Sequence, residues 1–570
     1  MSWWLSDVLR AKQERLEVAE LAERVRWLSV VNWRVGENLQ LAVDFDLTHQ
    51  GEIFVLSMAY PSTFPDTPPM VTPRNSKRLS NHQYGAGGEL CLEYRPDNWG
   101  PAVSGAMMIE SAYRLISGER PENKEPVAVP SVHQASVGRE LRGENMRFII
   151  PEEVLGALDS LTPNVPVPIQ AWDSYTKPTW VAVITNLGAD DIAIWSTAEP
   201  RPATAHLARG FVLRTEYNVG RFQTEATSFL DSLPTEFPVL AALVPEDFKG
   251  FILLGNGCRW ITLNLFTHEG KRFVFNYKTL IAPATAGRLP IEYAVLAGKH
   301  VAIVGCGSVG SKIAVTLARA GIRNFTLVDE DVFFAANLVR NELDAGAIGL
   351  HKVDALTTRL KEIAGSANIN CRRVALGQQE SAGTTESVME DLAKANLVID
   401  ATADPRAFNL VGAVARRTKM PMVWCQVFAG GIGGIVARLR PDLDPVPSSA
   451  RDQIQTWCES HGITWQDGAD RDYSGRSEDG TPLVADDADV SVIAAHAARM
   501  SLDTLVRPQS IFPASAYAIG LLEEWIFAAP FDTWPIDLQP DGTWGADQVQ
   551  ASGEEVLGFL KELFSDGRSA

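Results

Sequence analysis

The segment that decides the fold is residues 300–329, HVAIVGCGSVGSKIAVTLARAGIRNFTLVD. It combines an apolar run typical of a buried strand, a glycine-rich turn, a helical pattern and a second strand-like run. Gly305, Gly307 and Gly310 permit a tight turn and let a phosphate approach backbone N–H groups at the helix N-terminus. Asp329 follows about 20 residues later, where an acidic side chain can accept hydrogen bonds from ribose hydroxyls. The segment therefore predicts a nucleotide site in a doubly wound parallel sheet.

Polar side chains after the next predicted strands indicate which nucleotide binds. They are Asp331, Asn337, Arg340, Lys352, Asp400 and Asp404. Ligands of such sheets bind at the carboxyl ends of the strands. Cationic side chains suit a triphosphate there, and Asp404 suits Mg²⁺ or its bound waters. The set predicts ATP and Mg²⁺ as cofactors. It disfavours a nicotinamide-dependent oxidoreductase, because hydride transfer has no use for these groups.

Residues 305–404 resemble the ThiF/MoeB and ubiquitin-activating adenylyltransferases. They contain, in order, the pattern GxGxxG, D-x-D, N-L-x-R, G-x-x-K and D-x-T-x-D. The resemblance implies that ATP and the C-terminal carboxylate of a small protein react to an acyl-adenylate and pyrophosphate. It implies that Asp329 binds the ribose, that Asn337 and Arg340 surround the phosphates, and that Lys352 stabilises the transferring α-phosphate.

The same resemblance implies a metal ligand and a dimer. Asp404 is the implied Mg²⁺ ligand, but one extra residue between Asp400 and Asp404 leaves open which of the two takes that role. Relatives insert an arginine from a partner subunit or an upstream segment, for which Arg288 is a candidate. The family habit implies a homodimer through this domain.

An N-terminal cysteine motif indicates a second activity. Tyr60-Pro, Phe64-Pro and Pro68-Pro69 precede Gly87-Gly-Glu-Leu-Cys91-Leu, and Trp99-Gly-Pro follows. This order resembles a ubiquitin-conjugating domain, over about residues 20 to 120. The resemblance implies that Cys91 attacks an activated acyl group as a thiolate and holds it as a thioester until a target amine attacks.

Two features of this thiol chemistry stay open in the sequence. The family's His-Pro-Asn tripeptide is absent, and either Asn81 or His82 could be the polar partner of Cys91. Activating enzymes usually own a separate cysteine before a late helix. Cys458 is the candidate here, and the alternative is direct transfer from the adenylate to Cys91.

The predicted architecture is multidomain. An N-terminal α+β ubiquitin-conjugating-like domain, an α/β or α+β middle domain and a C-terminal doubly wound α/β (Rossmann-like) adenylation domain precede a helical tail. Their predicted bounds are 1–145, 146–290, 291–530 and 531–570. The middle domain holds no motif that carries chemistry, so a linker or docking role is expected. It does contain a predicted hairpin, with strands at about 260–266 and 272–277.

Composition excludes several classes of protein. The 51 Lys and Arg against 70 Asp and Glu give a net charge of −19, which argues against binding to nucleic acid or an anionic membrane. No apolar run is long enough to span a bilayer, and the N-terminus lacks the pattern of a secretory signal. The six cysteines are scattered without a CxxC motif, so neither a zinc site nor a disulfide framework is indicated. We therefore expect a cytoplasmic protein.

Together these motifs predict an activating and a conjugating enzyme in one chain. The combination resembles fusions in CBASS antiphage operons, where the protein joined through its C-terminus is a cGAS-like nucleotidyltransferase. It equally resembles fusions in bacterial operons whose partner is a small ubiquitin-like protein. A catalytically degenerate scaffold that binds nucleotide without turnover is the alternative that the missing tripeptide keeps open.

Overall fold

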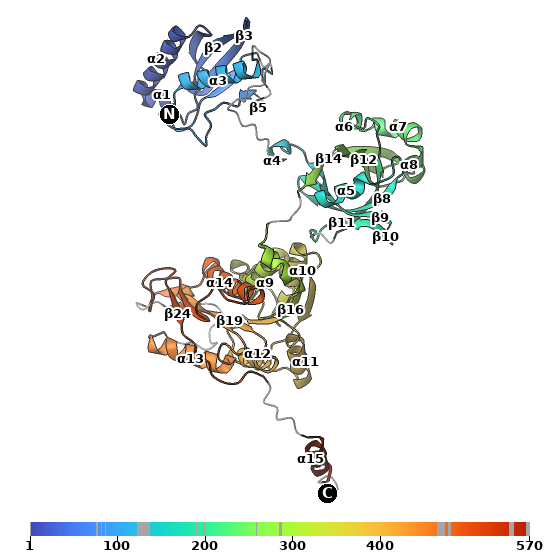
Figure 1. Cartoon of the computed structure of the whole chain (residues 1–570), viewed down its shortest axis with the longest axis vertical. Coiled ribbons are helices and arrows are strands. Elements are labelled where there is room, and N and C mark those ends of the chain that lie inside the picture. Colours follow the sequence, from blue (N-terminus) through green and yellow to red (C-terminus); the bar gives the residue numbers. More distant parts are fainter. Residues whose placement is uncertain are drawn as a thin grey trace. The chain divides into compact units, whose positions relative to one another are not determined.

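The computed structural model divides the chain into two units, Met1–Gly143 and Glu144–Ala570 (Figure 1). It describes residues 2–75, 78–80, 82–85, 87–121, 137–189, 191–197, 200–257, 259–283, 288–463, 474–476, 480–545 and 552–565.

The N-terminal unit is an α+β structure built on a four-stranded antiparallel sheet of order β1-β2-β3-β4. Its core lies between this sheet and the helices α2 and α3. The elements are α1 (Trp3–Ser6), α2 (Val8–Arg24), β1 (Leu28–Val35), η1 (Glu37–Leu39), β2 (Leu41–His49), β3 (Glu52–Ala59), β4 (Met70–Pro73), β5 (Gln83–Tyr84), β6 (Glu89–Leu90), α3 (Gly105–Glu119) and α4 (Val137–Glu140). β5 and β6 form a short hairpin outside the main sheet.

A buried carboxylate ties α2 to the sheet and to α3. Glu14 of α2 is fully buried, and its Oε2 accepts hydrogen bonds from the Tyr60 hydroxyl at 2.9 Å and the Gly105 amide at 2.7 Å. Its Oε1 accepts from Arg10 Nε at 3.0 Å. Burial nevertheless raises the pKa of Glu14. Since Gly105 begins α3, this side chain fixes where α3 starts.

Replacing Glu14 by alanine is expected to destabilise the N-terminal unit by about 3 kcal/mol, because it leaves the buried Tyr60 and Gly105 donors without their acceptor. Amide hydrogen exchange of the full chain measures this as a roughly hundredfold loss of protection in α2 and α3. Glu20→Ala, at an exposed position of the same helix, is the control. Unchanged protection in Glu14→Ala would contradict this role.

The middle part is a strand barrel with short helices. Its strands follow the order β10-β9-β7-β14-β13-β12-β11-β8, and β8 also pairs with β9, which closes the ring. The elements are β7 (Met146–Pro151), η2 (Glu152–Val154), α5 (Leu155–Asp159), β8 (Val167–Thr176), β9 (Thr179–Ala189), β10 (Ile192–Ser196), β11 (His206–Arg214), α6 (Arg221–Thr224), α7 (Ser228–Glu236), α8 (Pro238–Leu243), β12 (Gly250–Asn256), β13 (Arg259–His268) and β14 (Lys271–Ala282).

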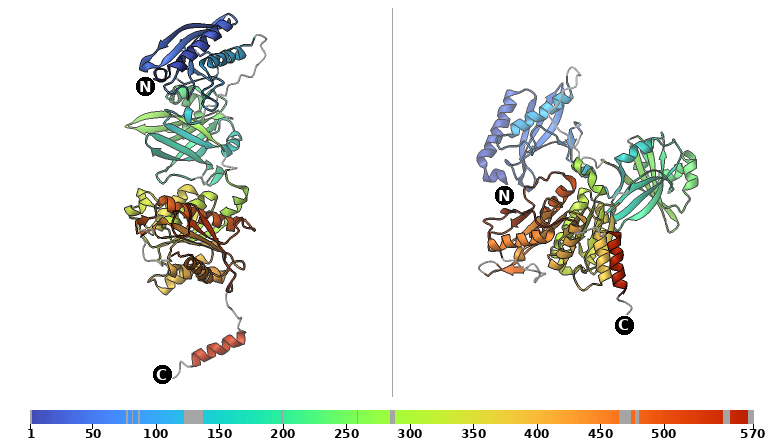
Figure 2. Two further views of the ribbon diagram at one scale, coloured as in Figure 1. Left: turned by 90° about the vertical axis from the view of Figure 1, so that its left-hand side faces the viewer. Right: turned by 60° about the horizontal axis from the view of Figure 1, so that its bottom comes forward.

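The strand pairing of the barrel bears on the two predicted classes of the middle part, α/β and α+β. The hairpin predicted around residues 260–277 is confirmed as the antiparallel pair β13–β14. One core cluster joins strands from around the ring, and a second packs α6–α8 against β11–β14. The ribbon of this part is shown from another side in Figure 2. Most strand pairs of the ring are antiparallel, although β11 and β12 pair in parallel with α6–α8 between them. Of the two predicted classes, this mainly antiparallel arrangement fits α+β.

The C-terminal part holds an eight-stranded sheet of order β17-β16-β15-β18-β19-β20-β23-β24. The five neighbouring strands β17, β16, β15, β18 and β19 run parallel to one another. The pairs β19–β20, β20–β23 and β23–β24 are antiparallel. The strands are β15 (His300–Val304), β16 (Asn324–Val328), β17 (Asn368–Arg372), β18 (Leu397–Asp400), β19 (Met422–Val427), β20 (Gly433–Leu439), β23 (Ala516–Gly520) and β24 (Thr533–Ile536). A separate small pair is formed by β21 (Ser474–Arg476) and β22 (Pro482–Val484).

Helices cover both faces of this sheet, as Figure 1 shows. They are α9 (Ser308–Ala320), α10 (Lys352–Ile363) and α14 (Asp487–Val506) on one face, and α11 (Ala382–Leu392), α12 (Pro405–Thr418) and α13 (Pro447–Ser460) on the other. Shorter turns are η3 (Ile291–Gly298), η4 (Ala335–Val339), η5 (Ala345–Ala347) and η6 (Ala429–Gly431). The predicted doubly wound, Rossmann-like sheet is confirmed.

The topology of this sheet predicts where a ligand binds. β15 lies between β16, the next strand along the chain, and β18, to which the chain returns after β17. The strand order therefore reverses at β15, and ligands of open α/β sheets bind in the crevice at such a switch point. The switch point lies at the carboxyl end of β15, directly before the glycine-rich turn.

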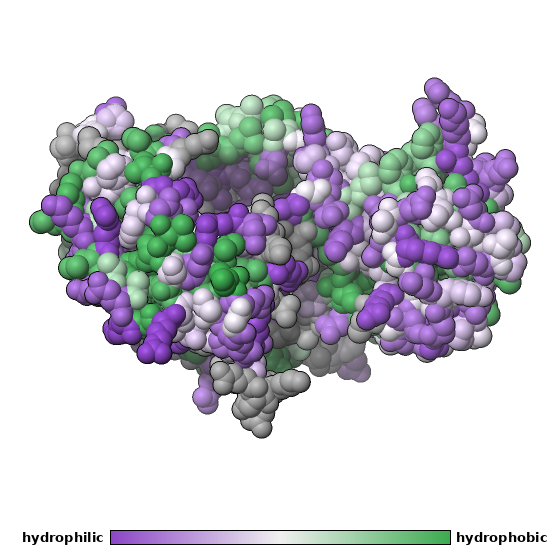
Figure 3. Space-filling model, turned by 90° about the horizontal axis from the view of Figure 1, so that it is seen from above, coloured by the Kyte–Doolittle hydropathy of each residue, from purple (hydrophilic) through white to green (hydrophobic). Residues whose placement is uncertain are grey.

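The C-terminal tail holds one further helix. The predicted tail helix is confirmed as α15 (Gly553–Ser565), and its apolar side chains, among them Phe559 and Phe564, are exposed. Figure 3 shows a face of the molecule on which hydrophilic and hydrophobic residues are interspersed. Among the helices that the structure describes, none has both the length and the apolar content of a membrane span.

Candidate functional site

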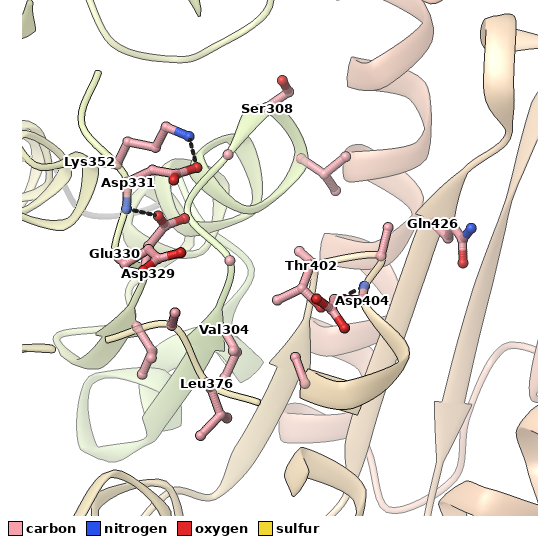
Figure 4. Close-up of a pocket in the computed structure, with 18 of the residues that line it drawn as sticks. Val304, Ser308, Asp329, Glu330, Asp331, Lys352, Leu376, Thr402, Asp404 and Gln426 are labelled. Atoms are coloured by element: carbon pink, nitrogen blue, oxygen red, sulfur yellow. Dashed lines mark hydrogen bonds and ion pairs between the residues drawn. The ribbon is translucent and has the colours of Figure 1, made fainter. Parts of the chain in front are cut away.

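A cavity of about 530 Å³ opens at the switch point of the C-terminal sheet, a size typical of small-molecule sites. Its walls come from the segments that follow β15, β16, β17 and β18 and from the end of β19 (Figure 4). Eight of the nine residues predicted to bind the nucleotide line it: Gly305, Gly307, Asp329, Asp331, Asn337, Arg340, Lys352 and Asp404. The ninth, Gly310, lies in the first turn of α9.

The glycine-rich turn forms an open cradle at the start of α9. Gly305 has a φ of +89°, which favours glycine, and a side chain at Gly307 would meet open space. A Cβ at Gly310 would collide with the carbonyl oxygen of Gly305, so Gly310 lets α9 pack against the turn. No described side chain caps α9. Its first N–H groups therefore suit an anion such as a phosphate.

Asp329 is partly buried and oriented by the backbone of this turn. Its Oδ2 accepts a hydrogen bond from the Cys306 amide at 2.7 Å, and its Oδ1 accepts from the Asp331 amide at 2.8 Å. Burial raises the pKa of Asp329, and the nearby Lys352 opposes that rise. Each carboxylate oxygen can still accept a second hydrogen bond, so the placement fits the ribose role.

Lys352 and Arg340 are two of the three cationic side chains that line the cavity, the third being Arg406. Lys352 is only 9% exposed, and its Nζ lies 2.8 Å from Oδ2 of Asp331, as Figure 4 shows. Arg340 donates through Nη1 to the Ala485 carbonyl at 3.2 Å. Asn337 accepts from the Phe334 amide, which shapes the turn before Arg340. Fixed cations next to a helix N-terminus are a suitable environment for phosphates.

The loop after β18 places Asp404 on the cavity wall and Asp400 behind it. Asp400 is fully buried, and its Oδ1 accepts from the Thr402 amide at 3.0 Å and the Thr402 hydroxyl at 2.6 Å. The Asp404 amide in turn donates to Thr402 Oγ1 at 3.1 Å. Ala403, between them, has a φ of +54°. Of the two candidate metal ligands, Asp404 is the one that lines the cavity.

Sequence reasoning missed three polar groups of this wall. Gln378 follows β17, Arg406 lies in the first turn of α12, and Gln426 lies near the end of β19. The rule that ligands bind at the carboxyl ends of strands could have indicated Gln378 and Gln426. Among the described residues there is no group of three His, Cys, Asp or Glu that could hold a metal ion. Mg²⁺ does not require one, because one or two carboxylates and substrate phosphates suffice.

Replacing Asp400 by asparagine is expected to remove a pH-dependent cost to stability. Burial raises the pKa of Asp400 to about 6. The pKa of this acid is higher in the folded protein than in the unfolded chain, where it is about 4. The free energy of unfolding therefore falls as pH rises from 4 to 6, and the fall is complete above pH 6. The pKa difference corresponds to about 3 kcal/mol. Asparagine keeps an oxygen for Thr402, so the variant should exceed the natural protein in stability at pH 7 but not near pH 4.

The measurement is the difference in free energy of unfolding between Asp400→Asn and the natural protein across this pH range. Asp452→Asn, at an exposed position of α13, is the matched control and should show no such trend. A difference that does not change with pH would contradict the assignment.

Cys91 lies in the N-terminal unit, directly after the β5–β6 hairpin. Its amide donates to the His82 carbonyl at 2.8 Å, so the two residues face each other across the end of the hairpin. Cys91 is 7% exposed. His82 Nε2 lies 3.9 Å from Oε1 of Glu119, in α3. The alternative partner, Asn81, lies outside the described residues.

Cys458 and Arg288 are not part of the cavity. Cys458 is fully buried on α13, and burial raises its pKa to about 12. A protonated, inaccessible thiol is unsuited to nucleophilic attack, so this surrounding does not support the prediction of a second nucleophile. Arg288 is exposed and does not line the cavity.

Comparison with known proteins agrees with this geometry over the C-terminal sheet. Residues 290–446 match the ThiF family. The matched segment includes the glycine-rich turn and every predicted nucleotide-binding residue from Gly305 to Asp404. It covers less than a third of the chain, so it assigns a family to this segment and not to the other parts.

Curated relatives are similar to about a quarter of this chain. An uncharacterised protein of Sinorhizobium fredii is 34% identical over 25% of this chain and 26% of its own length. The tRNA threonylcarbamoyladenosine dehydratase of Escherichia coli is 30% identical over 28% of this chain and 54% of its own length. The ATP-dependent ubiquitin transferase-like protein Cap2 of Pseudomonas aeruginosa is 30% identical over 23% of each chain. This chain therefore matches about a quarter to a half of each of these relatives.

A solved structure also resembles part of the chain. The structure of Escherichia coli MccB with ATP covers 44% of this chain and 68% of its own, with 15% identity and a TM-score of 0.34.

Proposed function

We propose that the C-terminal part activates a carboxylate with ATP. A carboxylate oxygen attacks the α-phosphorus, the bond from that phosphorus to the bridging oxygen breaks, and an acyl-adenylate and pyrophosphate result. The observation that carries this proposal is a cavity that joins a glycine cradle with cationic and acidic side chains. The match to the ThiF family and the similarity to a protein named as an ATP-dependent ubiquitin transferase-like protein support it.

Each polar group of the cavity has a proposed role. Asp329 accepts hydrogen bonds from the ribose, and the first turn of α9 binds phosphate oxygens. Arg340 and Lys352 neutralise the negative charge that develops during phosphoryl transfer. Mg²⁺ that enters with ATP is held by Asp404, and it supplies further neutralisation of phosphate charge.

Transfer of the acyl group to Cys91 is the proposed second step. The Cys91 thiolate attacks the acyl carbon, the bond to the AMP oxygen breaks, and AMP leaves while the acyl group stays as a thioester. The thiol proton passes to a base or to solvent, and His82 or Asn81 is the proposed polar partner. Because Cys458 is buried, we propose direct transfer from the adenylate. A target amine then attacks the thioester and releases Cys91.

The proposed biological setting is bacterial antiphage defence in the cytoplasm. The acyl donor is the C-terminus of a cGAS-like nucleotidyltransferase or of a ubiquitin-like protein. A homodimer through the adenylation part is supported by the turn that carries Asn337 and Arg340. The same turn exposes Phe334 and Val339, by 63% and 64%, and clustered exposed apolar side chains favour a subunit interface.

The test is an ATP–pyrophosphate exchange assay with the full chain and proteins encoded by its neighbouring genes. Exchange that depends on one such protein, and on its free C-terminus, identifies it as the acyl donor. ATP binding without exchange favours the catalytically degenerate scaffold instead. Binding of a nicotinamide dinucleotide in place of ATP would favour the oxidoreductase.

A further inference from the structure

The proposed metal ligand, Asp404, has no acceptor site left in the described structure. Its Oδ1 accepts from the Arg406 amide at 2.9 Å and from Arg406 Nε at 3.1 Å. Its Oδ2 accepts from Arg406 Nη2 at 2.7 Å and from Gln378 Nε2 at 3.0 Å. An ionised carboxylate offers about four lone-pair sites. A cation can therefore reach Asp404 only after at least one of these donors leaves.

Arg406 is the donor that can leave at the lowest cost. Its side chain is 58% exposed, whereas that of Asp404 is 19% exposed. Gln378 is held more firmly, because Gly377 before it packs against the backbone of Arg406 and Ala407 so closely that a Cβ there would lie 2.8 to 2.9 Å from it. The Arg406 amide can keep its hydrogen bond to Asp404, the N-cap residue of α12, while the guanidinium moves. Only the two guanidinium hydrogen bonds need to break.

The Arg406 guanidinium supplies positive charge to the Asp404 carboxylate. Mg²⁺ carries positive charge to the same carboxylate, so the guanidinium and the metal compete for it. Arg406 also lines the main cavity and the shallower hollow beside it, so space for the released side chain adjoins the site.

We propose that Arg406 is a positioning residue that holds Asp404 in the nucleotide-free site and is displaced from it when Mg²⁺ and ATP bind. This inference rests on the proposed ATP site. Arg406 acts as a stand-in cation: it keeps Asp404 oriented towards the cavity, and it makes nucleotide binding less dependent on Mg²⁺ than it would otherwise be.

The test is the coupling between Mg²⁺ and nucleotide in the full chain. The dissociation constant of a fluorescent, non-hydrolysable ATP analogue is measured in excess EDTA and in excess Mg²⁺. The ratio of the two constants reports how strongly the metal assists nucleotide binding. Arg406→Gln should raise this ratio about fivefold, because it leaves Asp404 as a bare negative charge without metal and as an uncontested ligand with it.

Three further variants make the result specific. Arg406→Lys keeps the positive charge and should bring the ratio back towards that of the natural protein. Asp404→Asn should bring the ratio close to one. Arg417→Gln makes the same substitution at an exposed position at the other end of α12 and should change nothing.

Two results would overturn the inference while ATP binding stands. One is an Arg406→Gln ratio equal to that of the natural protein. The other is an Arg406→Lys ratio that departs further than that of Arg406→Gln, which would indicate damage to the start of α12. If the analogue binds to no form of the chain under either condition, the proposed function itself fails, and this inference with it.

Discussion

Replacing Lys352 by alanine is expected to lower the rate of ATP–pyrophosphate exchange by about two to three orders of magnitude. Lys352 begins α10, is 9% exposed, and directs its Nζ to Asp331 at 2.8 Å on the cavity wall. A preoriented cation in a partly desolvated site stabilises developing phosphate charge more than a mobile surface lysine does. The alanine variant loses that stabilisation and leaves Asp331 without its counter-ion at the phosphate end.

The matched control is Lys361→Ala, at an exposed position in the last turn of the same helix. Its exchange rate should equal that of the natural protein. Binding of the ATP analogue shows whether the Lys352 variant still forms the cavity. Exchange that persists unchanged in Lys352→Ala, with nucleotide still bound, would exclude the proposed adenylation chemistry at this lysine.

Local patterns account for the part of the site that could be predicted. The glycine-rich turn, Asp329 and Lys352 are each set by short-range sequence around a strand end or a helix start. The rule for parallel sheets then brings those ends together. The same reasoning could not choose between Asp400 and Asp404, because one extra residue in the loop shifts both. Which aspartate lines the cavity depends on the hydrogen bonds of Thr402 and on the left-handed backbone conformation of Ala403. The spacing of apolar residues in the sequence indicates neither of them.

Features that depend on contacts distant in sequence could not be predicted. The middle barrel depends on parallel pairs such as β7–β14, whose partners are far apart along the chain. The strand pattern of this part did not distinguish an α/β fold from an α+β fold. The contacts of Arg406 and Gln378 with Asp404 could not be predicted for the same reason, since a loop after β17 meets the start of α12 at Asp404 only in the folded chain. Cys458 was a candidate because of its position before the late helix, but on α13 its side chain lies in the hydrophobic core.

Replacing Cys91 by alanine is expected to abolish the covalent adduct between this chain and its acyl donor. The adduct of the natural protein should dissociate in dithiothreitol, because a thioester exchanges with added thiol. Cys91→Ser should instead give an adduct that survives dithiothreitol, since an oxyester does not undergo that exchange. Non-reducing electrophoresis of the full chain with ATP, Mg²⁺ and the donor identified by pyrophosphate exchange separates these outcomes.

Cys458→Ala is the matched control for this experiment, because the two thiols differ in surroundings while the substitution is the same. Burial raises the pKa of Cys458 to about 12 and withholds it from solvent, so its loss should leave the adduct intact. Pyrophosphate exchange must persist in both variants, since adenylation precedes thioester formation. An adduct that survives Cys91→Ala but disappears in Cys458→Ala would reverse the assignment. It would also require α13 to open, which amide hydrogen exchange along that helix can detect.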